Sequence, residues 1–356
     1  MTVVAAFRTC GTPILIGDLL VTADTNIEES SFLPTSPGAA ATLSKDICAR
    51  IAGTRKKVHL FGGSVAVAWS GSWLAASSVL KDLKNFSEGR EVDRDILAAF
   101  LAQQTGWEDD GVLVVLTGWV VKPELLCFRW NSTWPQEVFF DDRFFDGSGD
   151  EIFEALIDEQ VRSAAGPGIE SNCEKAIYSV LAKVGKLISH EVFTGETLRS
   201  RFGYCYEVAY FDGARFRYVD EVTYLSWLVR ITDSEPRYQV MPAPAIVKYK
   251  NFGEFSAVQT VRLDTGAEVH TFFDVVTPAF SAMKELDPAK IGPLPTNSDL
   301  FCNVLQINAP SYNGVAALVN AASDKSFMNF EIRDGKHCFE INMRVVEQML
   351  GLGPQA

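Results

Sequence analysis

Residues 2–22 have the sequence TVVAAFRTCGTPILIGDLLVT, in which two runs of small and branched apolar residues flank a short polar segment. The runs at residues 3–7 and 14–22 are typical of strands, and the segment TCGTP at residues 9–13 is typical of a turn. We therefore predict a β-hairpin here. A three-residue loop at residues 9–11 would place Thr2 directly opposite Asp18, and a two-residue loop would offset them by one position.

A second hairpin is predicted at residues 57–69, where Gly62-Gly63 separates two apolar runs. As a two-residue turn, this pair would place Phe61 opposite Ser64 and Lys57 opposite Ala68. Gly71 would lie about 10 Å along the strand from that pair, at ~3.3 Å per residue. Lys57 and Gly71 would then share the open end of the hairpin.

Beyond the second hairpin the pattern alternates blocks of helices with blocks of strands. Helices are expected near residues 73–83, 96–103, 150–158 and 172–187, with Ser72 capping the first of them. Further strands are expected at 112–116, 125–130, 138–140, 203–211 and 216–219, and short β-like runs at 257–263, 268–273, 328–332 and 338–343. Residues 23–55 are expected to form a long surface loop with a short helix near 45–51. This block order favours an α+β fold.

Composition excludes several classes of function. The chain has 356 residues, of which 47% are hydrophobic, so it can bury a large core. It lacks a long apolar run and a signal-peptide pattern, and we expect a cytoplasmic protein that does not contact a membrane. A net charge of -13 argues against nucleic acid as a partner. Seven scattered cysteines without a C-x-x-C pair, and four distant histidines, argue against a disulfide framework, a metal site or a cofactor.

The stretch from Thr2 to about Val219 resembles the proteasome β-subunits and their bacterial HslV-type relatives, which are N-terminal-nucleophile (Ntn) hydrolases. The segments TVVAAF, LIGD and VT align without a gap. This resemblance puts the nucleophile at Thr2, the catalytic aspartate at Asp18 and a substrate-contacting threonine at Thr22. It implies a four-layer αββα sandwich in residues 1–240, with a β-rich extension of unknown role in residues 241–356 after a linker at MPAP, residues 241–244.

Three later segments extend the resemblance. The run RKKV at residues 55–58 is similar to the family's strand start and implies that Lys57 is the catalytic lysine. The interval from Lys57 to Gly71 equals the family's spacing to its oxyanion-hole glycine. The run GSG at residues 147–149 implies an auxiliary serine at Ser148. Trp69 falls where the family shapes its specificity pocket, which implies a shallow or blocked pocket; a core tryptophan is the alternative.

The chemistry implied by the resemblance suits these residue types. A threonine at residue one, after removal of Met1, carries its own base, because its α-amine has a reference pKa near 7.7–8.0. A charged Lys57 lowers the pKa of the neighbouring amine and hydroxyl, and the Asp18 carboxylate keeps that lysine charged. The Gly71 N–H would stabilise the oxyanion. The implied function is hydrolysis of peptides or small amides by a homo-oligomer.

Alternatives stay open at several of these positions. A second alignment moves the motif aspartate to Asp24, at the cost of a six-residue insertion in the hairpin. The family's later D-x-x-S-G pattern is replaced by a segment with Arg199, Phe202 and Gly203, which keeps only the glycine. Each matched residue also has an ordinary structural interpretation. The rival functions are a catalytically inactive scaffold or binding module, and a hydrolase of small amides rather than peptides.

Overall fold

The computed structural model describes residues 2–22, 51–105, 113–158, 171–231, 238–263, 269–281, 298–309, 312–321, 328–333 and 336–342, together with residues 291, 294 and 344. Most of the expected loop at 23–55, the short helix expected at 45–51 except its last residue, and the alternative aspartate Asp24 lie outside these ranges. None of the helices in the described part of the chain is long and apolar enough to cross a membrane.

The N-terminal hairpin forms the middle of a five-stranded antiparallel sheet. In sheet order its strands are β10 (Phe144–Gly147), β1 (Val3–Thr9), β2 (Thr12–Asp18), β11 (Tyr206–Phe211) and β12 (Phe216–Tyr218). Thr9 pairs with Thr12, so the loop is the two-residue turn at residues 10–11. Val4 therefore pairs with Gly17, and Asp18 lies one position away from the place opposite Thr2. This confirms the second of the two expected registers.

A second five-stranded antiparallel sheet contains the second hairpin. Its strands are β5 (Val58–Phe61), β6 (Val65–Gly71), β7 (Val114–Val120), β8 (Leu126–Asn131) and β9 (Val138–Asp141). The register expected from a two-residue turn is wrong by one position, because Phe61 pairs with Val65 and Val58 with Ala68. Ser64 joins Gly62 and Gly63 in the turn, where both glycines have positive φ. Lys57 therefore lies opposite Trp69, and the backbone N–H of Trp69 donates to the Lys57 carbonyl at 3.3 Å.

The two five-stranded sheets face each other across an apolar core that includes Val4, Leu15, Ala66 and Trp119. Helices α2 (Trp73–Ser87) and α3 (Arg94–Ala102) pack on the outer face of the second sheet. Ser72 caps α2 as expected and accepts the Ala75 N–H at 3.5 Å. On the other side, the first sheet is covered by α4, α5 and α6, whose bounds are Asp150–Asp158, Asn172–Thr194 and Glu196–Arg199.

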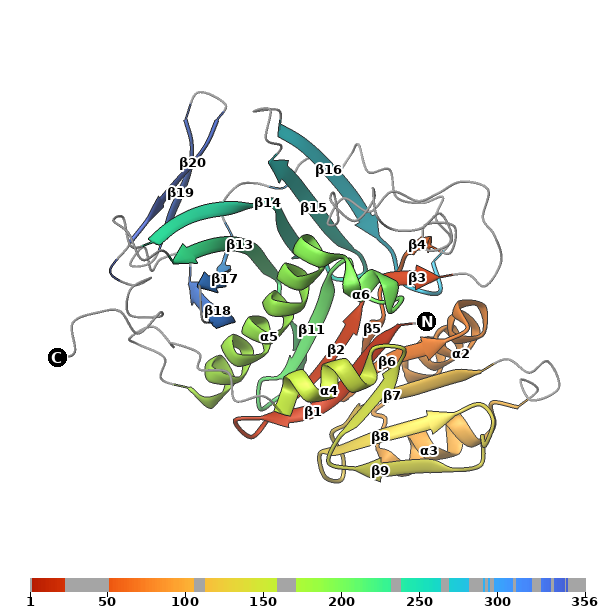
Figure 1. The fold of residues 1–356 in the computed structure, drawn as a ribbon. Coiled ribbons are helices and arrows are strands. Elements are labelled where there is room, and N and C mark those ends of the chain that lie inside the picture. The colour runs from red at the N-terminus through yellow and green to blue at the C-terminus, as the bar shows by residue number, and fades with distance from the viewer. Residues whose placement is uncertain are drawn as a thin grey trace.

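A six-stranded mixed sheet covers the opposite side of α5 (Figure 1). In sheet order its strands are β16 (Val269–Val276), β15 (Ser256–Leu263), β14 (Tyr238–Asn251), β13 (Glu221–Ile231), β17 (Leu300–Ala309) and β18 (Tyr312–Ala321), with β13 and β17 parallel. The approach is close, because a Cβ on Gly185 of α5 would lie 2.4 Å from Cys302 Sγ of β17. Two ribbons complete the described elements: β3 (Leu20–Thr22) with β4 (Ile51–Thr54), and β19 (Met328–Arg333) with β20 (Lys336–Ile341).

The expected four-layer αββα sandwich is wrong as the fold of this chain, because the six-stranded sheet lies beyond α5 and adds a layer to the helix–sheet–sheet–helix stack. Strands make up 48% and helices 25% of the structure, so it is mostly β-sheet. The physical reason is that the six-stranded sheet, built from strands that begin at Glu221, buries one face of α5, so this helix has a sheet on both sides. The expected linker at residues 241–244 lies inside β14, which crosses the boundary predicted at residue 240 and pairs with β13.

Candidate active site

Thr2 and Asp18 meet at the open end of the first hairpin. The Thr2 hydroxyl donates a hydrogen bond to Asp18 Oδ1. The Val3 N–H donates to the same oxygen at 3.0 Å, and the Gly203 N–H donates to Oδ2 at 3.0 Å. The Asp18 side chain is fully buried, and Thr2 is 1% exposed. The hairpin therefore directs the Thr2 hydroxyl at a carboxylate that two backbone N–H groups hold in place.

Lys57 adds a positive charge to this pair from the start of the second sheet. Its stem packs on Gly17, where an added Cβ would lie 2.6 Å from Lys57 Cβ. Its ammonium lies over the Trp69 ring, 4.2 Å from the centroid. Burial lowers the pKa of Lys57 to about 8, and attraction by Asp18 and Glu207 partly offsets this effect. Burial likewise raises the pKa of Asp18, against the charge of Lys57 and the hydrogen bonds of the carboxylate.

Gly71 and Ser148 both lie near this end of the two sheets. Gly71 has φ +86, and an added Cβ would lie 2.2 Å from the Leu113 carbonyl, so the position requires glycine. Ser72 N–H donates to that carbonyl at 2.8 Å. In an antiparallel ladder the neighbouring pair, Gly71 and Val114, is then a non-hydrogen-bonded pair, so the Gly71 N–H points away from β7. Ser148 Oγ donates to the Thr2 carbonyl at 3.5 Å. Gly147 lets this segment approach Thr2 closely, because an added Cβ there would lie 1.9 Å from the Thr2 carbonyl oxygen.

The two residues expected to contact substrate have different surroundings. Thr22 ends β3 as a half-buried residue and pairs with Ile51. Trp69 is 1% exposed and belongs to the core between the second sheet and α2. Its Nε1–H donates to the Lys56 carbonyl at 3.0 Å. The indole thus packs in the interior beneath Lys57, as in the alternative interpretation from the sequence.

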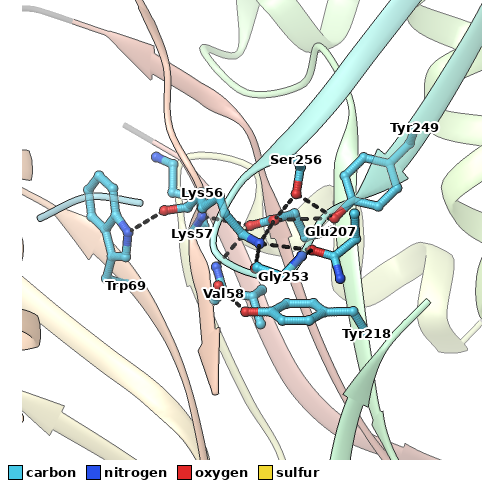
Figure 2. A network of polar contacts seen from close by, with 10 residues as sticks. Lys56, Lys57, Val58, Trp69, Glu207, Tyr218, Tyr249, Gly253 and Ser256 are labelled. Carbon is cyan, nitrogen blue, oxygen red and sulfur yellow. Dashed lines mark hydrogen bonds and ion pairs between the residues drawn. The ribbon is translucent and has the colours of Figure 1, made fainter. Parts of the chain in front are cut away.

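Sequence reasoning missed Glu207, which contacts the backbone beside Lys57 (Figure 2). Glu207 is fully buried, and its Oε2 accepts the N–H groups of Lys57 at 2.9 Å and Val58 at 3.1 Å. The one signal in the sequence is an acidic residue inside the apolar strand YEVAYF at residues 206–211. Gly203, noted only as the remnant of a motif, also matters because its N–H binds Asp18.

The arrangement combines a hydroxyl bonded to a buried carboxylate with a buried ammonium that interacts electrostatically with that carboxylate. A lysine whose pKa lies near 8 changes its charge close to neutral pH, as groups that transfer protons in catalysis do. Within the described ranges, no three His, Cys, Asp or Glu side chains gather closely enough to hold a metal ion.

Comparison with known proteins adds no relative. The sequence matches no protein-family model, and no curated protein matches it. The resemblance to proteasome β-subunits therefore depends on the motif residues and their spacing alone.

Proposed function

We propose that the chain is a threonine-type hydrolase of peptide or small amide bonds, in which Thr2 becomes the nucleophile once Met1 is removed. One observation carries this proposal. Thr2 and Asp18 are hydrogen bonded in a buried site, and the Asp18 carboxylate interacts electrostatically with Lys57, whose pKa is about 8. In this proposal the chain is related to the proteasome β-subunits through its site residues.

The proposed reaction uses the Thr2 hydroxyl and the α-amine freed by loss of Met1. The hydroxyl oxygen attacks the substrate carbonyl carbon, and the hydroxyl proton moves to the α-amine. The carbonyl electron pair becomes an oxyanion, which the Gly71 N–H stabilises. Collapse breaks the C–N bond, and the leaving amine takes the proton. Water then hydrolyses the resulting ester and restores the Thr2 hydroxyl.

Asp18 and Lys57 prepare the nucleophile in this scheme. Asp18 orients the hydroxyl and keeps Lys57 protonated, because an opposite charge nearby favours the charged form. The protonated lysine lowers the pKa of the α-amine, so that more of the amine is free to accept a proton at neutral pH. Activity then requires a neutral amine and a charged Lys57.

The compartment, assembly state and partners of the protein are part of the same proposal. We propose a cytoplasmic homo-oligomer that uses neither metal nor cofactor and binds neither nucleic acid nor membrane. The net charge of -13 supports the exclusion of nucleic acid. Free thiols at Cys10, Cys127, Cys173, Cys205 and Cys302 support a reducing compartment.

The test combines intact mass with labelling of the full chain. The mass of the purified protein reports whether Met1 is lost. A peptide epoxyketone bonds to both a hydroxyl and the adjacent α-amine, so we expect one adduct, located on Thr2 by peptide mapping. Thr2→Ala should abolish the adduct and Thr2→Ser should retain it. A processed chain that stays unlabelled would overturn the proposal, and rates on short peptides against acylated amines would separate the two substrate classes.

A catalytically inactive binding module is the second candidate, favoured by two observations. Thr2 is only 1% exposed, and the segment that corresponds to the family's auxiliary motif contains Arg199 and Phe202 instead. A processed but unlabelled chain would support this candidate. Thr2→Ala would then leave its biological role intact.

A further inference from the structure

A buried polar cluster joins the six-stranded sheet to the backbone beside Lys57. Glu207 of β11 lies at its centre (Figure 2). While Oε2 of Glu207 takes the two N–H groups at the start of β5, Oε1 accepts the hydroxyls of Ser256 at 3.2 Å and Tyr249 at 3.3 Å. Those hydroxyls come from β15 and β14, and they also contact each other at 2.9 Å. One carboxylate thus connects β5 to the C-terminal sheet.

Lys56 makes the same connection from the other direction. Its ammonium lies 3.4 Å from Glu207 Oε1, and it donates to Asn251 Oδ1 at 3.1 Å and to the Gly253 carbonyl at 3.0 Å. It also lies over the Tyr218 ring, 4.3 Å from the centroid. The neighbouring Lys57 points to the opposite side, over Trp69. The segment that carries both lysines is therefore fixed on one side by residues 249–256.

This arrangement constrains β5 strongly, because buried charges are tolerated only when their partners are in place. Glu207 is fully buried and Lys56 is 1% exposed. Removing one partner of such a pair leaves an uncompensated charge, so the cluster holds its geometry as a unit. Without Tyr249 and Ser256, Glu207 Oε1 would lose both of its hydroxyl donors, and without Asn251 the Lys56 ammonium would lose one of its two neutral acceptors.

We propose that Glu207 is a positioning residue for Lys57, and that the C-terminal sheet holds Glu207 in place through Tyr249 and Ser256. The inference rests on the proposed function, because it gives Lys57 a catalytic position to maintain. It assigns a role to residues 249–256, which the sequence alone left without one. The C-terminal sheet is then part of the catalytic unit.

Two consequences follow for Lys57. The charged side chains that act on its ammonium are Asp18 of β2 and Glu207 of β11. Neutralising Glu207 removes one of these attractions and weakens the anchoring of the Lys57 N–H, so the Lys57 pKa should fall below its value of about 8. The alkaline limb of the rate profile, which requires a charged Lys57, should move to lower pH.

The experiment compares Glu207→Gln with Glu221→Gln in the full chain. Glu221 is the matched control: it is a buried glutamate of β13 that pairs with Lys248 and Lys250. Two readouts are measured. The first is the rate of epoxyketone labelling of Thr2 against pH. The second is the titration of the Lys57 side chain by NMR of the protein labelled with ¹³C-lysine, assigned with Lys57→Arg.

We expect Glu207→Gln to slow labelling on the order of 10–100-fold and to lower the Lys57 pKa by about one unit. Tyr249→Phe, a milder change, should shift both readouts in the same direction and covers the case in which Glu207→Gln does not fold. Glu221→Gln should leave both unchanged. If Glu207→Gln or Tyr249→Phe loses thermal stability while both readouts stay at wild-type values, Glu207 is only structural and the inference is overturned.

The NMR titration separates this inference from the proposed function. If wild-type Thr2 is never labelled, the hydrolase proposal fails. A shift of the Lys57 titration in Tyr249→Phe, which removes no charge, would still establish the positioning, and unchanged titrations in both Tyr249→Phe and Glu207→Gln would reject it.

Discussion

The Thr2 hydroxyl donates a hydrogen bond to Asp18 Oδ1 inside the protein, where the two side chains are 1% and 0% exposed. Backbone N–H groups of Val3 and Gly203 donate to Oδ1 and Oδ2 of the same carboxylate. Burial raises the pKa of Asp18 and lowers that of Lys57, and each charge offsets the shift of the other. The carboxylate and the ammonium are thus a coupled pair, and a change at one should be detected at the other.

Replacing Asp18 by asparagine tests this coupling. Asp18→Asn keeps the shape but removes the charge, so the pKa of Lys57 should fall below about 8. Labelling of Thr2 at neutral pH should slow by about 10²-fold or more, because both the orientation of the hydroxyl and the charge on Lys57 are lost. Labelling kinetics and the NMR titration of Lys57 measure the two effects. The half-buried turn residue Asp212 supplies the control Asp212→Asn, which should change neither; equal effects in both variants would contradict the coupling.

Lys57 should also make stability depend on pH. Its pKa is lowered from 10.5 in an unfolded chain to about 8 in the folded protein. Below pH 8 the lysine is charged in both states and the cost of burying the charge is fully present. Between pH 8 and 10.5 the unfolded state binds more protons, so stability rises with pH through this window.

The comparison with Lys57→Met isolates this contribution. Relative to the variant, the wild-type protein should gain roughly 3 kcal/mol of unfolding free energy between pH 8 and pH 10.5, since one pKa unit corresponds to about 1.4 kcal/mol. Urea unfolding of both proteins across this range measures the difference. Parallel stability curves would show that the Lys57 pKa is not lowered.

Local features of the fold could be predicted from the sequence because they depend on neighbouring residues. The two strands around residues 3–18, the bounds of α4 and the cap at Ser72 all follow from sequence patterns within a few positions. The predicted register of the second hairpin was wrong by one position, because the sequence does not reveal that Ser64 joins the turn. Convergence of Thr2 and Asp18 followed from hairpin geometry, whichever loop length applied.

Long-range pairing had no comparable signal. The parallel pairing of Val222 with Leu300 joins segments far apart in the chain, and no local pattern specifies it. Pro242 and Pro244 suggested a linker, because proline removes a backbone donor and is rare inside sheets, yet both lie in β14. Glu207 could not be assigned to Lys57, because their contact depends on how β11 meets β5. These pairings explain why the fold class was wrong.

The contact between Gly17 and Lys57 predicts that even a methyl group will disturb the site. A Cβ at residue 17 would lie 2.6 Å from Lys57 Cβ and 3.3 Å from Val58 Cγ2. Neither atom is at the far end of a flexible chain, so Gly17→Ala should push the root of the lysine away. We expect a loss of about 1–3 kcal/mol of stability and slower labelling of Thr2.

Gly185→Ala is the matched control for this prediction. It would place a Cβ 2.4 Å from Cys302 Sγ, a similar clash at the contact of α5 with the six-stranded sheet. It should lower the melting temperature comparably and leave the labelling rate per folded molecule unchanged. Equal losses of labelling rate in the two variants would mean that Gly17 acts only through stability.

The face of the Trp69 ring beneath the Lys57 ammonium predicts a difference between two substitutions. The ring lies 4.2 Å from the ammonium, and its negative face favours the charged form of the lysine. Trp69→Phe keeps an aromatic face but loses the Nε1–H bond to the Lys56 carbonyl, whereas Trp69→Leu loses both. We therefore expect the Lys57 pKa to stay near wild type in the phenylalanine variant and to fall in the leucine variant, as measured by NMR titration.

Trp119→Phe is the control. It removes a comparable buried hydrogen bond, from the indole to the Ile14 carbonyl at 2.8 Å, and should destabilise the fold without moving the Lys57 titration. Identical titrations in the leucine and phenylalanine variants would show that the ring face contributes nothing to the charge on Lys57.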